Sequence, residues 1–285
     1  MLRRCLSTGR PWKQSREPSK VNLPKGEALY GIHSVRQALQ CNQRVFHKLF
    51  LRDTNGQKKK PTVDDERYVK EIKAMAVEAG ISVSYESKWT LNHAVDDKPH
   101  QGVVLFADPL SIPEYIPQEP QLDAQGRPRL ILALDEIHDA QNFGAVLRSA
   151  HFLGCDSVLT SMRHSAPLSP AVVRASVGAA EVLVSENRLL ETRNMHQALA
   201  MSKDLGWTIV GACSGAKSLS LPTFELTTPT ILVMGNEHRG LKSNIKQCCD
   251  VLVTIPGQTN HASKVDSLNL SVATGILLYQ LLHVK

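Results

Sequence analysis

VTIPGQTNHASKVDSLNLSVA, residues 253–273, is the stretch that decides the expected fold of this 285-residue chain. The apolar run 251–255 ends at Pro256-Gly257, which predicts a buried strand followed by a turn. After a polar loop, a helix is expected to begin at Ser267-Leu268-Asn269, because apolar residues then recur at helical spacing. A strand that leads into a helix through a loop rich in backbone donors is a good site for a polar ligand.

Two further turns of this kind lie upstream. The apolar run 230–234 is followed by Gly235-Asn236-Glu237-His238-Arg239-Gly240, where two glycines let the backbone approach a neighbour closely. The apolar run 130–134 is followed by the polar segment DEIHDAQN and by a helix that carries Gly144 and Arg148. Those two residues are four apart and share a helix face, so we expect bare backbone beside a guanidinium that can fork onto a phosphate.

Three motifs in this order resemble those of the SpoU (TrmH) family of RNA 2′-O-ribose methyltransferases, in the SPOUT class. They are N-x-G-x-x-x-R-S-A from Asn142, G-N-E-x-x-G from Gly235, and I-P from Ile255 followed by S-L-N-x-S-V-A from Ser267. The resemblance covers residues 130–282. It implies an α/β catalytic domain with a deep trefoil knot, S-adenosyl-L-methionine as methyl donor, RNA as substrate, no metal, and a homodimer whose active sites use both subunits.

The resemblance also implies roles for single residues. The expected catalytic residues are Asn142, Arg148, Glu237, Ser267 and Asn269. The expected cofactor-binding residues are Gly211, Gly235, Asn236, Ile255 and Leu268. Because a guanidinium is a poor proton acceptor at neutral pH, we expect Arg148 to hold the target phosphate rather than to act as the base.

Other roles are open for several of these residues. Ile255 and Leu268 also suit core packing. Ser267 and Asn269 have the side chains of helix caps, a role that is compatible with catalysis. Glu237, between two glycines, also suits a structural hydrogen bond or ion pair that shapes the donor loop.

The first half of the chain predicts a small α/β domain over residues 25–108. We expect a turn and helix over 27–39, a helix over 67–79, and strands near 48–51, 81–85 and 102–106.

The segments YGIH (30–33) and HQGV (100–103) resemble the L30e-like substrate-binding domain that precedes the catalytic domain in many family members. His33 and His100 are therefore candidate RNA contacts, and a structural histidine is the alternative for each. A proline-rich linker is predicted over 109–128, and the methyltransferase domain over 129–285.

The N-terminal residues 1–22 have the composition of a mitochondrial transit peptide. Six of the first twenty residues are basic, one is acidic, and no apolar core is present. A basic tail that touches RNA is the alternative. The chain has a net charge of +6, most of which lies in this segment, so any basic footprint for nucleic acid must be local. Lys58-Lys59-Lys60 is one such patch, and a solvated loop is the alternative for it.

The six cysteines contain no C-x-x-C pair, and no histidine cluster has metal-ligand spacing, so neither zinc nor disulfides are expected. No G-x-G-x-x-G follows a predicted strand, which argues against a Rossmann enzyme, and Ala216 replaces the glycine that a phosphate loop needs.

The full pattern implies methylation of a guanosine in the peptidyl-transferase region of mitochondrial large-subunit rRNA, in the matrix. Methylation of tRNA and a catalytically silent ribosome-assembly factor are the alternatives. The polar loop 258–266 is longer than expected for bacterial relatives, and its contacts are open.

Overall fold

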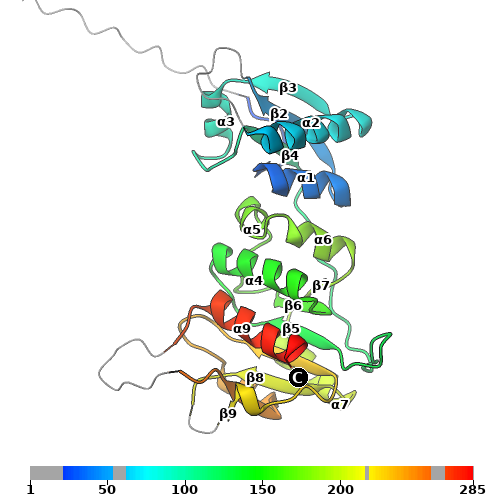
Figure 1. Ribbon diagram of the computed structural model, residues 1–285, viewed down its shortest axis with the longest axis vertical. Coiled ribbons are helices and arrows are strands. Elements are labelled where there is room, and N and C mark those ends of the chain that lie inside the picture. The colour runs from blue at the N-terminus through cyan, green and yellow to red at the C-terminus, as the bar shows by residue number, and fades with distance from the viewer. Residues whose placement is uncertain (1–21, 54–61, 216–217, 258–266, 285) are drawn as a thin grey trace, which may run out of the picture.

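The computed structural model describes residues 22–53, 62–215, 218–257 and 267–284, and within them the chain forms two helix-covered sheets. Figure 1 shows one sheet at each end of an elongated molecule, with α5 and α6 between them. The α/β architecture expected from the sequence is confirmed. The expectations for the leader, the lysine-rich loop, Ala216 and the loop 258–266 lie outside the described residues.

The N-terminal unit has a mixed sheet of order β1-β4-β2-β3, in which only β2 and β3 are parallel. Its strands are β1 (Glu27–Tyr30), β2 (Phe46–Arg52), β3 (Ser82–Glu86) and β4 (Val103–Ala107). Its helices are α1 (Ile32–Cys41), α2 (Val63–Glu78) and α3 (Lys88–Ala94). Where we expected a turn, β1 pairs with β4, and Gly31 at φ 93° separates it from α1.

The C-terminal unit has an all-parallel sheet of order β7-β6-β5-β10-β8-β11-β9. Its strands are β5 (Leu130–Leu134), β6 (Ser157–Ser161), β7 (Leu189–Thr192), β8 (Thr208–Ala212), β9 (Leu219–Ser220), β10 (Thr230–Met234) and β11 (Val251–Thr254). Its helices are α4 (Ala140–Leu153), α5 (Pro170–Ala175), α6 (Ala179–Ser185), α7 (Met195–Asp204), α8 (Ser243–Cys248) and α9 (Leu270–His283), with a short 3-10 turn at Leu221–Thr223.

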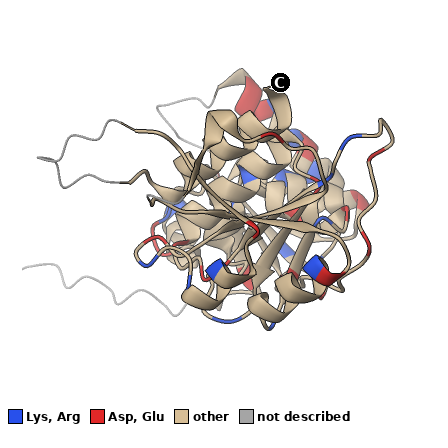
Figure 2. Ribbon diagram, turned by 90° about the horizontal axis from the view of Figure 1, so that it is seen from below, with Lys and Arg blue, Asp and Glu red and all other residues tan. Residues whose placement is uncertain are grey.

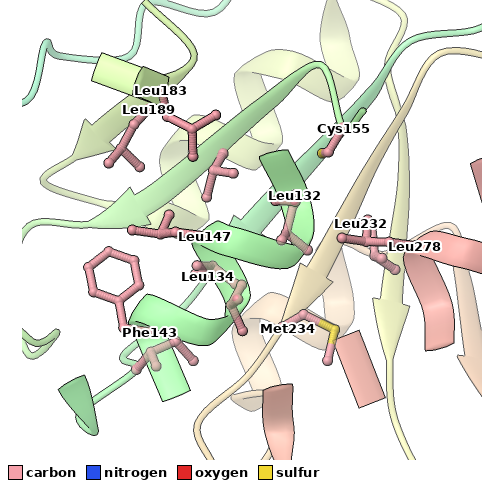
Figure 3. Packing of buried hydrophobic residues seen from close by; sticks show 14 of the residues in the cluster. Leu132, Leu134, Phe143, Leu147, Cys155, Leu183, Leu189, Leu232, Met234 and Leu278 are labelled. Carbon is pink, nitrogen blue, oxygen red and sulfur yellow. The ribbon is translucent and has the colours of Figure 1, made fainter. Parts of the chain in front are cut away.

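Alternation along the central strands sends side chains to two separate cores. Leu132 and Leu134 of β5 pack with α4, α6 and α9, whereas Ile131 and Ala133 pack with α7 and α8. Figure 3 shows Phe143 and Leu147 of α4 within the first of these cores. Both faces of a parallel sheet must be covered by helices, which explains why its strands read as continuous apolar runs.

Helix α4 begins and ends as its sequence predicts. Asp139 caps it by accepting a hydrogen bond from the backbone N–H of Asn142 at 2.7 Å, and Gly154 ends it in the left-handed conformation. The expectation for Gly144 was wrong: its bare backbone is buried against α5, where a β-carbon would clash with Ala175. Gly144 therefore serves close packing of two helices and is not open to a phosphate.

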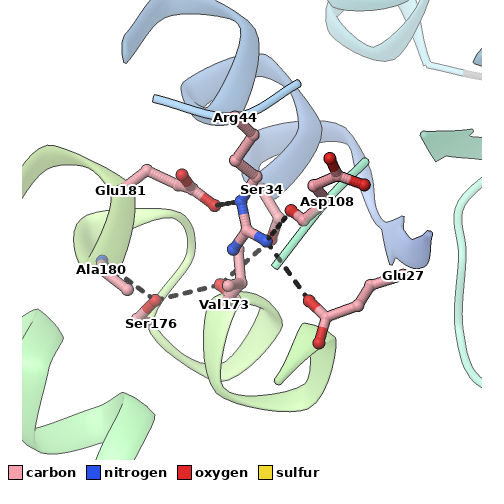
Figure 4. Close-up of polar contacts among 8 residues, drawn as sticks. All are labelled: Glu27, Ser34, Arg44, Asp108, Val173, Ser176, Ala180 and Glu181. Carbon is pink, nitrogen blue, oxygen red and sulfur yellow. Dashed lines mark hydrogen bonds and ion pairs between the residues drawn. The ribbon is translucent and has the colours of Figure 1, made fainter. Parts of the chain in front are cut away.

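A buried ion pair joins the two units. The Nε atom of Arg44, which follows α1, lies 2.8 Å from Oε1 of Glu181 on α6, and neither side chain is exposed (Figure 4). Arg44 also donates to Glu27 at 3.3 Å and to the carbonyl of Asp108 at 3.0 Å. Burial raises the pKa of Glu181, and the charge of Arg44 opposes that shift.

Close packing surrounds this ion pair. Val173 of α5 is buried in the core of the N-terminal unit, and its carbonyl accepts a hydrogen bond from Ser34 at 3.3 Å. A β-carbon at Gly178 would lie 2.5 Å from the Cβ atom of Gln37, so a larger side chain there would push the units apart. The two units are thus held in one arrangement by apolar contact as well as by charge.

The proline-rich segment 109–128 packs along the C-terminal unit. Leu110 is buried in its core, the Tyr115 hydroxyl lies 2.9 Å from Ser202 of α7, and the Trp207 indole donates to the carbonyl of Gln118 at 2.8 Å. The predicted linker is therefore attached to the sheet edge and α7 over much of its length.

Charges of both signs are interspersed over the C-terminal unit, as Figure 2 shows. No helix in the described part of the chain is long and apolar enough to cross a membrane. The described cysteines are free thiols, and burial raises the pKa of Cys155 to about 12 and that of Cys249 to about 11. Both are protonated at neutral pH and are poor nucleophiles.

We predict that Glu181→Leu and Arg44→Met will each lower the free energy of unfolding by about 3–5 kcal/mol, because Arg44→Met removes the cation beside the buried Glu181 carboxylate and Glu181→Leu removes the closer of the two carboxylates beside the buried Arg44. The double variant should lose less than the sum of the two, since it buries no unpaired charge. Urea denaturation of all three proteins measures this coupling. Additive losses would show that the ion pair does not join the units.

Candidate active site

The loops that follow β5 and β10 meet where the strand order of the parallel sheet reverses. Backbone N–H of Asp135 donates to the carbonyl of Met234 at 2.9 Å, and Asn236 Nδ2 donates to the carbonyl of Glu136 at 2.8 Å. Asn236 Oδ1 also accepts from the backbone N–H groups of His238 and Arg239. In parallel sheets, ligands bind outside the carboxyl ends of the strands at such reversal points, so a ligand site is expected here.

Three of the predicted catalytic residues form a hydrogen-bonded chain here, although they come from three motifs. Asn269 Nδ2 donates to Asn142 Oδ1 at 3.0 Å, and Asn142 Nδ2 lies 3.5 Å from Glu237 Oε1. We call Asn269, Asn142 and Glu237 the amide relay. It places two amides and a carboxylate at the N-terminal ends of α4 and α9.

The direction of the amide relay follows from helix capping. Asn269 Oδ1 accepts from the backbone N–H groups of Ser271 at 2.9 Å and Val272 at 3.4 Å, so it faces the N-terminus of α9. Its Nδ2 must then point to Asn142, which presents its oxygen to Asn269 and its own NH₂ group to Glu237. The capping role and the role in the relay therefore coexist in Asn269, and Ser267 lies exposed two residues before it.

Arg148 is not part of the amide relay. It lies six residues after Asn142 on α4, which turns it about 120° away around the helix axis. Its side chain is exposed and lines a cavity of about 250 Å³ between α4, the α5–α6 connection and α1 of the N-terminal unit. Within one chain, Arg148 therefore lies apart from Asn142, Asn269 and Glu237.

The predicted cofactor residues lie at the carboxyl ends of neighbouring strands. Gly211 is on β8, Gly235 follows β10 and Ile255 follows β11. Gly211 packs tightly, since a β-carbon would lie 2.8 Å from Cys249 and Leu241, and a β-carbon at Gly235 would clash with the carbonyl of Gly240. The glycines keep these loops in close contact and leave main-chain groups at the strand ends, which fits a ligand held by backbone.

Ile255 and Leu268 differ in their surroundings. Ile255 is half-buried and packs against the main core, in line with the packing alternative. Leu268 is 52% exposed, so core packing does not explain it.

Comparison with known proteins identifies the family. Residues 129–279 match the SpoU rRNA Methylase family, and residues 28–113 match the RNA 2′-O ribose methyltransferase substrate binding family. The chain belongs to the SpoU rRNA methylase family. The resemblance expected from the three motifs is thereby confirmed.

Relatives and solved structures agree with this assignment. The chain is 34% identical to rRNA methyltransferase 1, mitochondrial, from Homo sapiens, over 90% of this chain and 72% of that protein. It is 31% identical to the 23S rRNA (guanosine-2′-O-)-methyltransferase RlmB of Pseudomonas syringae pv. tomato, over 91% and 96% of the two chains. The AdoMet-bound rRNA methyltransferase from Sinorhizobium meliloti has the same fold, with a TM-score of 0.65 and 24% identity over 89% and 85% of the chains.

This SpoU methylase is an enzyme that transfers the methyl group of S-adenosylmethionine to a ribose 2′-oxygen of rRNA. Its described residues contain no group of three or more His, Cys, Asp or Glu side chains that could hold a metal ion.

The polar segment after β5 contains two carboxylates that form ion pairs the sequence did not predict. Asp135 is buried, and Lys242 Nζ lies 3.5 Å from its Oδ2 atom and 2.7 Å from Oε1 of Glu136. Burial raises the pKa of Asp135, whereas the hydrogen bond from Lys242 lowers the pKa of Glu136. Lys242 is the N-cap residue of α8 but makes no capping hydrogen bond with its side chain, which instead connects the loop after β5 to the start of α8. Because Lys242 is more than 100 positions from Asp135 and Glu136, no local sequence pattern predicts this contact.

The two histidines proposed as RNA contacts have different surroundings in this SpoU methylase. His100 is buried: its Nδ1 accepts from the backbone N–H of Gly102 at 3.0 Å and its Nε2 lies 2.9 Å from Asn92 Oδ1. Burial and the charges of Arg52 and Lys88 lower its pKa, which keeps it neutral. The structural alternative thus describes His100, whereas His33 lines the same cavity as Arg148.

We predict that Asn269→Asp will keep the helix cap of α9 but remove the hydrogen bond from residue 269 to Asn142. Aspartate caps a helix as well as asparagine and suits the helix dipole, so the free energy of unfolding should change by less than about 0.5 kcal/mol. It cannot donate to Asn142, and the rate of methyl transfer should fall about 10- to 100-fold. Asn269→Ala should lose the same activity and about 1 kcal/mol of stability.

Asn194→Asp is the matched control, because Asn194 caps α7 through Gln197 in the same way and lies outside the amide relay. Thermal melts and transfer of a labelled methyl group to RNA provide the measurements. Wild-type activity in Asn269→Asp would show that the donor of the relay has no part in the reaction.

Proposed function

We propose that this SpoU methylase modifies a guanosine in the peptidyl-transferase region of mitochondrial large-subunit rRNA. The support is the likeness to the human mitochondrial rRNA methyltransferase 1 and to RlmB, a 23S rRNA (guanosine-2′-O-)-methyltransferase. The transit-like composition of residues 1–22 agrees with import into the mitochondrial matrix. The alternative substrate within the same chemistry is tRNA.

The observation that carries the catalytic proposal is the amide relay at the carboxyl ends of β5 and β10. S-adenosylmethionine brings a methyl group that its sulfonium already activates, so the protein mainly has to position the 2′-hydroxyl. Asn142, Glu237 and Asn269 offer fixed hydrogen-bonding groups for this task, with Ser267 beside them. Arg148 is proposed to hold the target phosphate through its guanidinium fork.

The donor is proposed to bind to main-chain groups of the loops after β8, β10 and β11. Gly211, Gly235 and Ile255 supply these groups at three adjacent strand ends, Leu268 lies where α9 begins, and Asn236 shapes the loop after β10. We also propose that the catalytic domain contains the deep trefoil knot expected from the resemblance. The proposed division of the chain is a leader (1–22), an L30e-like domain (25–108), a linker (109–128) and the methyltransferase domain (129–285).

A homodimer is proposed because α9 presents an apolar stripe to solvent. Leu268, Val272, Ile276 and Tyr279 follow one another at helical spacing and are 52%, 50%, 39% and 56% exposed. Arg148 is separated from the amide relay within one chain. A dimer that covers α9 can supply Arg148 of one subunit to the relay of the other, as the resemblance to SpoU enzymes implies.

To test the substrate, we propose mapping 2′-O-methylation in mitochondrial rRNA and tRNA from cells whose only copy is wild type or Arg148→Ala. One guanosine mark in large-subunit rRNA should disappear with Arg148→Ala while protein abundance is unchanged. Arg193→Ala, which removes an exposed arginine at the end of β7, should keep the mark. Loss of a tRNA mark instead would favour the tRNA alternative, and persistence of every mark would contradict the catalytic role of Arg148.

To test the dimer, Ile276→Glu should convert the protein to a monomer, because a carboxylate in the centre of an apolar interface is costly to desolvate. Light scattering after size-exclusion chromatography measures the mass. Val77→Glu on α2 is the matched control, since Val77 is 61% exposed and far from α9 in the sequence. A wild-type protein that is already monomeric at micromolar concentration would contradict the proposal.

A further inference from the structure

We propose that the cavity between the two units is a second RNA subsite, which holds the phosphodiester next to the target nucleotide with groups from both units. This inference rests on the proposed function, because it takes Arg148 as the residue beside the target. The cavity has a volume of about 250 Å³ and opens beside Arg148. We call it the interdomain cavity.

Its lining is basic on both sides. The N-terminal unit contributes His33 and Arg36 of α1, and α4 contributes Arg148 and His151. Among the described residues that line it, none is Asp or Glu. Arg36 and Arg148 bring one guanidinium from each unit, which favours an anion, and RNA is the anion that the family binds.

Two polar atoms at the interdomain cavity are buried without a hydrogen-bond partner. They are Nε of Arg36 and Nδ1 of His151, which come from different units. Buried polar groups are nearly always paired, so each of these atoms is expected to gain a partner in the working complex. A phosphate oxygen accepts from a guanidinium Nε–H and from the imidazole tautomer that carries its hydrogen on Nδ1.

The Arg36 guanidinium is already positioned for such a contact. Its Nη2 atom lies 2.8 Å from Glu71 Oε1, and its Cζ atom lies 5.4 Å from the centre of the Tyr68 ring. The edge of the His33 ring packs on the same tyrosine at 5.3 Å. Tyr68 and Glu71 of α2 thus hold both side chains of α1 in place and leave the Nε atom of Arg36 to a ligand.

The floor and rim of the cavity fit a nucleotide. Val177 lies in its wall with φ 55°, a conformation that is strained for a β-branched residue and is concentrated at functional sites. Phe152 lies on the rim with 84% of its surface exposed and offers a face for base stacking. The volume is below that of usual cofactor sites, which favours one phosphodiester and its ribose over a whole cofactor.

The buried Arg44–Glu181 pair keeps this cavity at a constant width. It joins the chain after α1 to α6, and both α1 and α6 contribute to the cavity wall. The subsite is therefore present before RNA arrives, and little conformational entropy is lost when RNA binds.

The test uses the full-length protein and a fluorescent transcript that spans the peptidyl-transferase region of large-subunit rRNA. Anisotropy titrations over a series of salt concentrations give the dissociation constant and its salt slope, and methyl transfer gives KM and kcat. For Arg36→Gln combined with His151→Gln, we expect an affinity at least tenfold weaker and a salt slope smaller by about one. KM should rise in parallel while kcat stays within about twofold.

Two controls separate binding from structure. Arg193→Gln removes an exposed charge elsewhere, so RNA affinity should stay within about twofold. Arg36→Lys keeps the charge without the fork, so it should restore the salt slope but only part of the affinity.

Several results would overturn the subsite. Unchanged affinity and slope in the folded double variant would do so, as would an equal loss in Arg193→Gln. If the double variant does not fold, His151→Gln alone decides, with a loss of at least threefold expected and an unchanged affinity contradicting the proposal. If wild-type protein binds the transcript but transfers no methyl group, the proposed function fails, and the binding comparison still judges the cavity.

Discussion

A guanidinium with no exposed surface lies at the junction of the two units, and the arrangement of the whole molecule depends on its partners. Arg44 reaches Glu181 of α6, Glu27 of β1 and the carbonyl of Asp108, so one side chain contacts three parts of the chain. A buried charge needs a partner, because an unpaired one is costly to keep out of water. Arg44 and Glu181 come from different units, so each has its partner only while the units are docked. Domain orientation is therefore set by an electrostatic requirement in addition to apolar contact.

At the carboxyl ends of the parallel strands, one side chain likewise serves two structural purposes. The N-terminus of α9 needs an acceptor for its free N–H groups, and Asn269 supplies it with one end of its amide. The other end is then committed to Asn142, which in turn directs its NH₂ group to Glu237. A structural demand of one helix thus orients polar groups of three distant motifs.

Arg148 and the amide relay lie in different parts of the molecule. The relay lies over the strand ends, where loops rich in backbone donors are exposed. Arg148 lies six residues further along α4, on another side of the helix and beside the interdomain cavity, where it faces side chains of the N-terminal unit. If the proposed roles hold, one side of α4 serves the reaction and another places RNA, and the N-terminal unit takes a direct part in positioning the substrate.

The sequence by itself determined the elements that depend on near neighbours. The strands at 130–134, 230–234 and 251–254, the start of α9 at Asn269 and the order of the three motifs all followed from periodicity, capping residues and turns within a few positions. Those local signals identified the family and predicted three polar residues that meet in the amide relay. They also misjudged Gly144, whose function depends on α5, a helix more than twenty residues further along the chain.

Only the tertiary structure decided which of these residues meet. Asn142 and Asn269 are 127 positions apart, and Arg44 and Glu181 are 137 positions apart, so no local pattern records either contact. The strand β1 forms because β4 offers it an edge, and the interdomain cavity exists because α1 docks on the α5–α6 connection. Periodicity reports which face of an element is buried, but the partner on that face is chosen by packing and charge over the whole chain.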